Sequence, residues 1–181
     1  NLTTIESYAF YNCKALTELD FSNTKLTTLG NLNSATGYYY DSRAFYGCAA
    51  ITSVTFPSTI ETIGGITFYG CSKLASVDFS QATNLTIMEG GVFYNCSSLT
   101  SIDLSNTQLE FVGTYNSSSK VYVNGYMYGQ SSAYNFKGCT KLTTVKLPET
   151  IKYLSVGMFN GCSALTTVNF TDLINLEKIM N

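Results

Sequence analysis

Six cysteines are the residues of this 181-residue sequence with the clearest capacity for chemistry. Thiolates act as nucleophiles, bind zinc, and oxidise in pairs to disulfides, so the cysteines raise a catalytic, a metal and a disulfide interpretation. The sequence contains no histidine. Imidazole is the usual base of cysteine and serine hydrolases, so we exclude those enzymes for this segment and predict no catalytic residue.

The surroundings of the cysteines favour a packing role. A phenylalanine stands three residues before each one, no two cysteines form a C-x-x-C pair, and all occupy one apolar column. Free cysteine packs well as a small buried hydrophobe. We therefore favour a reduced core ladder over disulfides, and either of these over a metal site, and we predict no metal and no cofactor. The predicted ladder comprises Phe10, Cys13, Phe45, Cys48, Phe68, Cys71, Phe93, Cys96, Phe136, Cys139, Phe159 and Cys162.

The residues after each cysteine predict a short strand. Apolar side chains recur three, six and eight residues after it, as in Leu99, Ile102 and Leu104 after Cys96. The last two positions have the period-two spacing of a strand with one buried face. The chain then turns, and a second apolar pair such as Ile60 and Ile63 leads to the next phenylalanine.

The residue before each cysteine is always Asn or Gly, the two types that most readily adopt positive φ. This predicts that each F-x-x-C stretch is a single helical turn ended by a left-handed residue. A unit of this size cannot bury both apolar stripes alone, so the units must stack into a solenoid. We predict about six coils of 23–25 residues, arranged as two super-repeats of three coils, because spacer lengths and prolines recur in every third coil.

The composition limits the classes of partner. The net charge is −2 and only 12% of residues are charged, which provides no basic field for nucleic acid, so we expect no nucleic-acid partner. No apolar run approaches the length of a membrane span, so we expect no membrane insertion. The first residues, Asn1-Leu2, match the middle of a repeat at Asn84-Leu85. We therefore expect residues 1–181 to be a single solenoid fragment of a longer protein.

The repeat resembles a known family, the BspA-like leucine-rich repeats of bacterial surface proteins. The resemblance implies a right-handed, curved leucine-rich-repeat solenoid with short parallel strands on its concave face. It also implies a secreted or cell-surface location, since members are similar to adhesins that bind host matrix proteins or other bacteria. The clearest copy reads Leu142-x-x-Val145-x-Leu147-Pro148-x-x-Ile151-x-x-Leu154-x-x-x-Met158-Phe159-x-x-Cys162.

Two insertions, at about residues 30–43 and 113–134, depart from the family pattern. Both follow the first coil of a trio, so we expect them on one edge, roughly 15 Å apart. They are rich in Tyr, Gly, Ser and Asn, the residues of antibody-like binding loops, although the tyrosines could instead only cover the edge of the solenoid. Asn124-Gly125 predicts a β-hairpin in the second insertion. The candidate ligand-binding residues are Tyr38, Tyr39, Tyr40, Arg43, Tyr122, Tyr126 and Tyr128.

The solvent side of the predicted strand is a second candidate surface. It carries a column of Thr, a column of Ser and Thr, and three aspartates, Asp20, Asp78 and Asp103. Such a surface could hydrogen-bond a glycan or a peptide, but polar β-favouring residues are more often only surface. We therefore predict a non-enzymatic extracellular or cell-surface binding module for a protein or glycan, possibly of the host matrix. The main alternative is a structural stalk that presents other domains.

Overall fold

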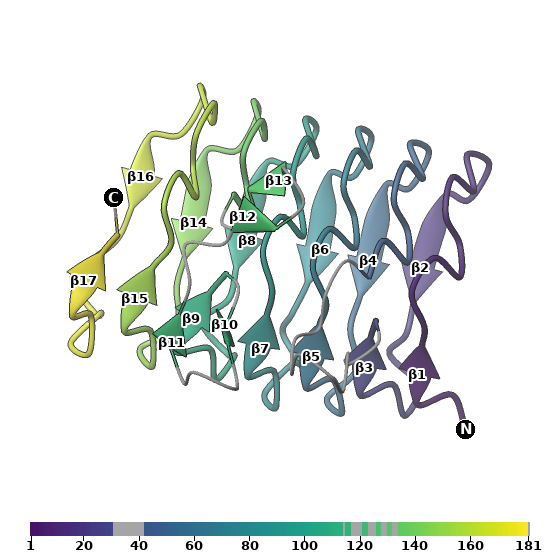
Figure 1. The fold of residues 1–181 in the computed structure, drawn as a ribbon, viewed down its shortest axis with the longest axis horizontal. Helices are drawn as coiled ribbons and strands as arrows, with labels where there is room; N and C mark the ends of the chain where they lie inside the picture. Colours follow the sequence, from purple (N-terminus) through teal and green to yellow (C-terminus); the bar gives the residue numbers. More distant parts are fainter. Residues whose placement is uncertain are drawn as a thin grey trace.

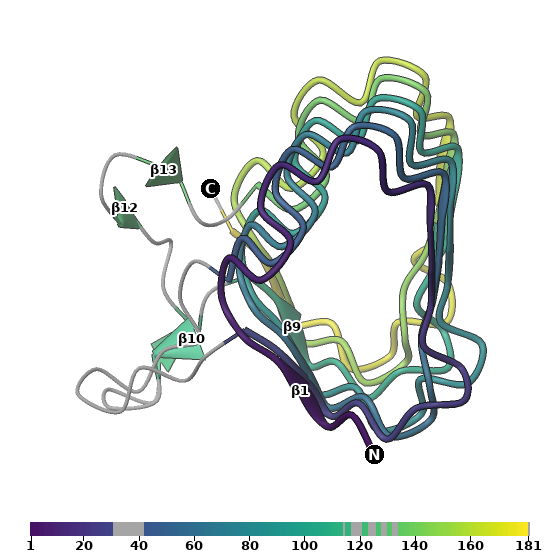
Figure 2. The ribbon, with the colours of Figure 1, turned by 90° about the vertical axis from the view of Figure 1, so that its right-hand side faces the viewer.

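The chain folds into a stack of coils (Figure 1). The computed structural model describes residues 1–30, 42–113 and 134–180, and the strand backbones at 115–116, 121–122, 126–127 and 130–131. Viewed along the stack, each coil has three sides (Figure 2). Two sides are walls of short parallel strands and the third consists of turns, so the fold is a leucine-rich-repeat solenoid as the sequence predicts.

The first wall contains the strands that the sequence predicts after each cysteine. Its central residues, such as Val54 and Ile102, are buried in four of the six strands and partly buried in the other two, whereas the flanking residues of most strands face solvent. This alternation explains why a three-residue strand is recognisable in the sequence. The strands form two three-stranded parallel sheets: β2 (Glu18–Asp20), β4 (Ser53–Thr55) and β6 (Ser76–Asp78), then β8 (Ser101–Asp103), β14 (Thr144–Lys146) and β16 (Thr167–Val168).

The second wall is a seven-stranded parallel sheet that the sequence analysis did not assign. It is built on the second apolar pair of each coil, and the inward residues Leu29, Ile63, Met88 and Val112 are buried. Each strand is only two residues long, which is too short to show an alternating pattern. The strands are β1 (Thr4–Ile5), β3 (Thr28–Leu29), β5 (Thr62–Ile63), β7 (Ile87–Met88), β9 (Phe111–Val112), β15 (Tyr153–Leu154) and β17 (Lys178–Ile179).

The third side, which we call the turn face, comprises residues 8–16, 43–51, 66–74, 91–99, 134–142 and 157–165. In every F-x-x-C stretch the cysteine N–H donates to the phenylalanine carbonyl at 3.0–3.2 Å. The prediction of single helical turns is wrong, because these bonds close isolated turns and the described residues contain no helix. The prediction of a left-handed residue before each cysteine is confirmed, since all six have φ between 58° and 76°.

When one coil has Asn at this left-handed position, the next coil has Gly there, and a steric contact explains why. A Cβ placed on Gly138 would lie 2.2 Å from the Oδ1 atom of Asn95, and the same separation holds between Gly47 and Asn12. Each asparagine side chain therefore lies over the left-handed residue of the next coil. Only glycine leaves room for it there.

The core is the predicted ladder. The six phenylalanine rings stack on one another with centroids 5.1–5.8 Å apart and interplanar angles of 4–11°. The five cysteines after the first donate their Sγ–H to the phenylalanine carbonyl of the preceding coil at 3.0–3.2 Å. All six thiols are free in the structure. Burial raises the pKa of the Cys139 thiol to about 12.

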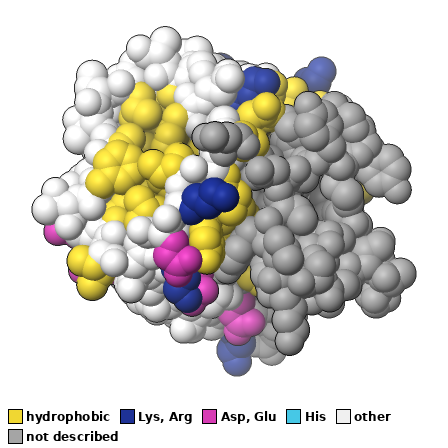
Figure 3. Space-filling view, turned by 60° about the vertical axis from the view of Figure 1, so that its left-hand side comes forward, with side chains coloured by type: hydrophobic (Ala, Val, Ile, Leu, Met, Phe, Trp, Pro, Cys, Tyr) yellow, Lys and Arg dark blue, Asp and Glu magenta, His cyan; other side chains and the backbone are white. Residues whose placement is uncertain are grey.

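The two ends of the stack depart from the ladder. Phe10 is 41% exposed and Cys13 is exposed, although both were predicted core residues, because no coil packs on that side of them. Apolar side chains also gather at the C-terminal end of the stack (Figure 3), where Phe170, Ile174 and Ile179 are exposed.

Candidate functional site

Four threonines that directly precede strands or sit at the edge of the first wall are engaged with the backbone. Their Oγ1 hydroxyls donate to a carbonyl of the preceding coil at 3.0–3.4 Å. A hydroxyl used in this way is not free to donate to a ligand. The geometry therefore supports a structural role for this column. The donors are Thr52, Thr100, Thr143 and Thr166.

The three candidate aspartates close turns at the ends of their strands. The Oδ1 atom of Asp20, Asp78 and Asp103 accepts the N–H of the residue two positions later, at 2.8–3.1 Å. The coils with Pro57 and Pro148 at that position have no N–H to donate and carry Thr or Lys in place of the acid. The aspartates are therefore Asx-turn residues, and no two of them are paired as an acid and a base.

Electrostatics around these aspartates agree with that role. Hydrogen bonds from Ser22 lower the pKa of Asp20. Burial raises the pKa of Asp103, but hydrogen bonds from Lys146 and Ser105 outweigh it and leave the pKa lowered. The Asp103–Lys146 ion pair has an N–O distance of 2.8 Å, and both side chains are more than half exposed, so solvent screens it.

We expect Asp78→Ala to lower the free energy of unfolding by about 0.5–1.5 kcal/mol, because the Ser80 N–H loses its acceptor. Asp78→Asn keeps an acceptor oxygen and should be nearly neutral, as Asn169 already fills the same role in its coil. Urea unfolding of the two variants tests the assignment. Equal destabilisation by both changes would contradict it.

The insertions leave the solenoid at equivalent positions. The first begins after Gly30, which follows β3, and the second after Gly113, which follows β9. The two strands are three steps apart in the seven-stranded sheet, which corresponds to roughly 15 Å. Both exit points therefore lie on the corner between this sheet and the turn face, as the sequence predicts for the flanking residues.

The second insertion contains two antiparallel strand pairs. β10 (Tyr115–Asn116) pairs with β11 (Val121–Tyr122), and β12 (Tyr126–Met127) pairs with β13 (Gln130–Ser131). The turn predicted at Asn124-Gly125 falls between the two pairs and lies outside the described residues, as do Tyr38, Tyr39, Tyr40 and Tyr128. Of Tyr122 and Tyr126, the structure describes only the backbone.

Arg43 is the insertion-edge candidate whose side chain the structure places. Its guanidinium carbon lies 5.9 Å from the ring centroid of Tyr8 and 5.6 Å from that of Tyr46, so it interacts with two aromatic rings at once. The first insertion therefore rejoins the solenoid at a cation held over tyrosines.

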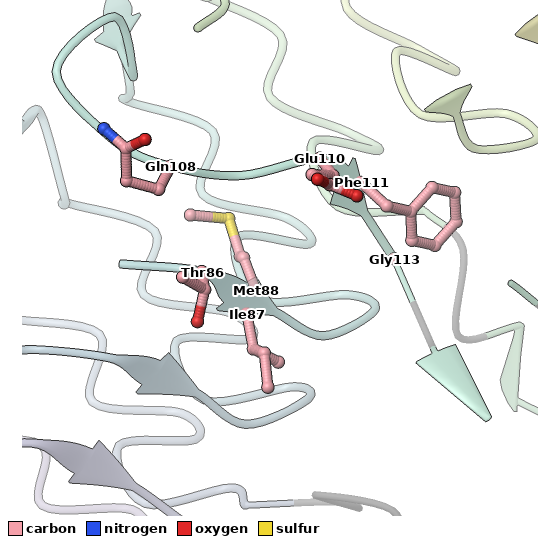
Figure 4. A pocket seen from close by; sticks show the side chains of 7 residues that line it. All are labelled: Thr86, Ile87, Met88, Gln108, Glu110, Phe111 and Gly113. Atoms are coloured by element: carbon pink, nitrogen blue, oxygen red, sulfur yellow. The ribbon is translucent and has the colours of Figure 1, made fainter. Parts of the chain in front are cut away.

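A shallow hollow of about 260 Å³ lies between β7 and β9, next to the start of the second insertion (Figure 4). The two strands pair only at Met88 and Val112, whereas most neighbours in this sheet share two pairs. The volume of the hollow suits one side chain or one sugar ring rather than a larger ligand. No sequence pattern points to it. Its lining residues are Thr86, Ile87, Met88, Gln108, Glu110, Phe111 and Gly113.

The described residues contain neither a metal-binding cluster nor a membrane-spanning helix. Among them, no group of three or more Cys, Asp or Glu side chains is arranged to hold a metal ion. No helix long and apolar enough to cross a membrane occurs among them either.

Comparison with known proteins identifies the family. The model of the BspA type leucine rich repeat region matches six copies, over residues 1–115 and 128–181. The chain belongs to the BspA-type leucine-rich repeat family. The residues that match the BspA-type model include all six F-x-x-C turns.

Solved structures of other leucine-rich repeat proteins share the fold of this BspA-type chain. A leucine-rich repeat protein of T. pallidum has a TM-score of 0.58 and 21% identity, over 91% of this chain and 72% of its own. A leucine rich cell surface protein of Faecalibacterium prausnitzii has a TM-score of 0.57 and 23% identity, over 84% of this chain and 32% of its own. No curated protein matches the sequence.

Proposed function

We propose that the chain is a non-enzymatic, extracellular or cell-surface binding module that recognises a protein or a glycan through its two Tyr-rich insertions. The observation that carries this proposal is the common exit of both insertions at one corner of a rigid solenoid, roughly 15 Å apart. Binding residues are disproportionately found on loops that a rigid scaffold positions. Two such loops on one corner can contact one partner.

The first wall is the less suitable binding surface. Its Thr hydroxyls donate to backbone carbonyls and its aspartates close turns, so much of its hydrogen-bonding capacity is used inside the solenoid. The hollow beside Gly113 adds a recess with apolar and polar lining next to the second insertion. We therefore place the binding surface at the insertion corner, which lies between the seven-stranded sheet and the turn face and opposite the first wall (Figure 2). The family match and the similar fold of a leucine rich cell surface protein support the proposed location.

The test is a binding screen of the chain against extracellular-matrix proteins and a glycan array. The screen is repeated with both insertions shortened to the five-residue step of the other coils. We expect any partner found to lose at least tenfold in affinity when the insertions are removed, while thermal unfolding of the stack stays cooperative. Undiminished binding after the excision would assign recognition to the solenoid walls. No binding by either form would favour the stalk.

A further inference from the structure

The turn face is positively charged, although the net charge of the whole chain is −2. Its six segments contain five of the ten Lys and Arg residues of the chain and none of the 12 Asp and Glu residues. The rest of the chain therefore has a net charge of −7, against +5 on this one face. All six segments lie within the described residues. The cations are Lys14, Arg43, Lys73, Lys137 and Lys141.

A row of stacked tyrosines, which we call the tyrosine stripe, runs along the same face. It consists of Tyr11, Tyr46, Tyr69 and Tyr94, each two residues before a cysteine. Successive ring centroids are 4.7–5.0 Å apart and the rings are parallel to within 9°. Tyr11 is 40% exposed and the other three rings are half-buried, so the stripe lies at the surface of four consecutive coils.

Cations contact the tyrosines of this face at both ends of the stripe. The Nζ atom of Lys137 lies 5.3 Å from the ring centroid of Tyr94 and 4.4 Å from that of Tyr134. Arg43 makes the corresponding contacts with Tyr46 and Tyr8 near the other end. In the part of the chain that the structure describes, Lys137 has no carboxylate within ion-pair distance. Its charge is held on aromatic rings and remains available to an anion.

The arrangement of the rings restricts what the stripe can bind. Because the inner tyrosines stack face to face, their faces are covered by one another, and a partner meets mainly ring edges and hydroxyls. This leaves little ring face on which a sugar could stack. Tyrosine edges and hydroxyls, with the cations of Arg43 and Lys137 against the rings, instead match the Tyr- and Arg-rich centres of protein interfaces. The +5 charge adds complementarity to an acidic partner.

We infer that the turn face is a docking surface for an acidic, extended segment of a partner protein, aligned along the tyrosine stripe. The stripe spans four coils, or about 15 Å at the spacing of paired strands. A stretch of about five extended residues covers that length. The inference does not require the insertion loops, because the rings and cations that carry it lie within the described segments.

The experiment measures fluorescence anisotropy of a labelled 20-residue glutamate-rich peptide with the purified chain. An equally long Gly/Ser peptide, heparin and a single-stranded DNA of similar charge are the comparison probes. We expect the acidic peptide to bind, with an affinity that falls as NaCl is raised because the contact is electrostatic. The neutral peptide should not bind. Tighter binding of heparin or DNA than of the acidic peptide would overturn the assignment to a protein partner.

Variants locate the contact on this face. The change K73Q/K137Q/K141Q should weaken binding by roughly tenfold or more, since each lost surface charge costs about two- to fivefold. Lys25→Gln removes an exposed lysine outside the turn face and is the matched control, expected to change affinity less than twofold. Tyr94→Phe keeps the stacked ring, removes the hydroxyl, and should weaken binding without unfolding the chain. Equal effects of Lys25→Gln and Lys137→Gln would overturn the inference.

The insertions separate this inference from the proposed function. Removing residues 31–41 and 114–132 restores the five-residue step and retains the tyrosine stripe and all five cations, Arg43 included. The acidic peptide should therefore bind this shortened chain as tightly as the intact chain. Loss of peptide binding on excision would place the acidic contact in the insertions and contradict a docking surface on the turn face.

Discussion

Phe93→Ala should lower the free energy of unfolding by about 3–5 kcal/mol. The Phe93 ring is fully buried, stacks between Phe68 and Phe136 at 5.7 Å from each, and meets the edge of Phe79 at 6.4 Å. Hydrogen bonds of the neighbouring coils hold their rings in place, so the cavity left by the substitution cannot close. Urea unfolding followed by circular dichroism measures the loss as a lower midpoint.

Phe10→Ala is the matched control for Phe93→Ala. The Phe10 ring occupies the same column but is 41% exposed and stacks only on Phe45, at 5.1 Å. Less area returns to water when it is removed, so we expect a cost of about 1–2 kcal/mol. Equal costs at the two positions would contradict a ladder whose energy comes from burial between coils.

The second large effect is alkaline destabilisation. Burial raises the pKa of Cys139 to about 12 from the ordinary 9.0, and it raises the pKa values of Cys71 and Cys96 as well. The unfolded chain loses these protons near pH 9, whereas the folded chain keeps them. The folded state therefore binds more protons above pH 9, and the free energy of unfolding falls as pH rises.

The size of this effect follows from the number of thiols. Each thiol that ionises only in the unfolded chain removes about 1.4 kcal/mol per pH unit, so three remove about 4 kcal/mol between pH 8 and 10. Urea unfolding across this range, with reductant present, measures the slope. Cys96→Ala removes one of the three thiols and should therefore reduce the slope by about 1.4 kcal/mol per pH unit. An unfolding free energy that stays constant from pH 8 to 10 would contradict burial of the thiols.

The sequence predicts the core well because every copy repeats the same physical constraint. The Phe and Cys columns, the strand after each cysteine and the left-handed Asn or Gly all follow from periodicity and φ preference. The seven-stranded sheet was missed because its strands have two residues each. The Asx turns are visible in the sequence as Asp or Asn two residues before Ser or Thr, as at Asp78 and Ser80, but the same residues also fit a polar ligand surface.

The candidate sites were less predictable for a physical reason. The insertions occur once each, so no repeated neighbour constrains their residues, and only their composition and exit points follow from the sequence. The charge of the turn face is not evident from the composition, because a net charge of −2 averages a basic face with an acidic remainder. Summing charge segment by segment around each cysteine would have shown it.

The central claim is that the cysteines of the repeated F-x-x-C motif are reduced and packed in the core. A count of reactive thiols tests this claim most directly. With a thiol reagent and no reductant, the native chain should show one rapidly reacting cysteine, the exposed Cys13, and five protected ones. In denaturant all six should react. Fewer than six in denaturant would show disulfides, and rapid reaction of all six in the native chain would contradict the ladder.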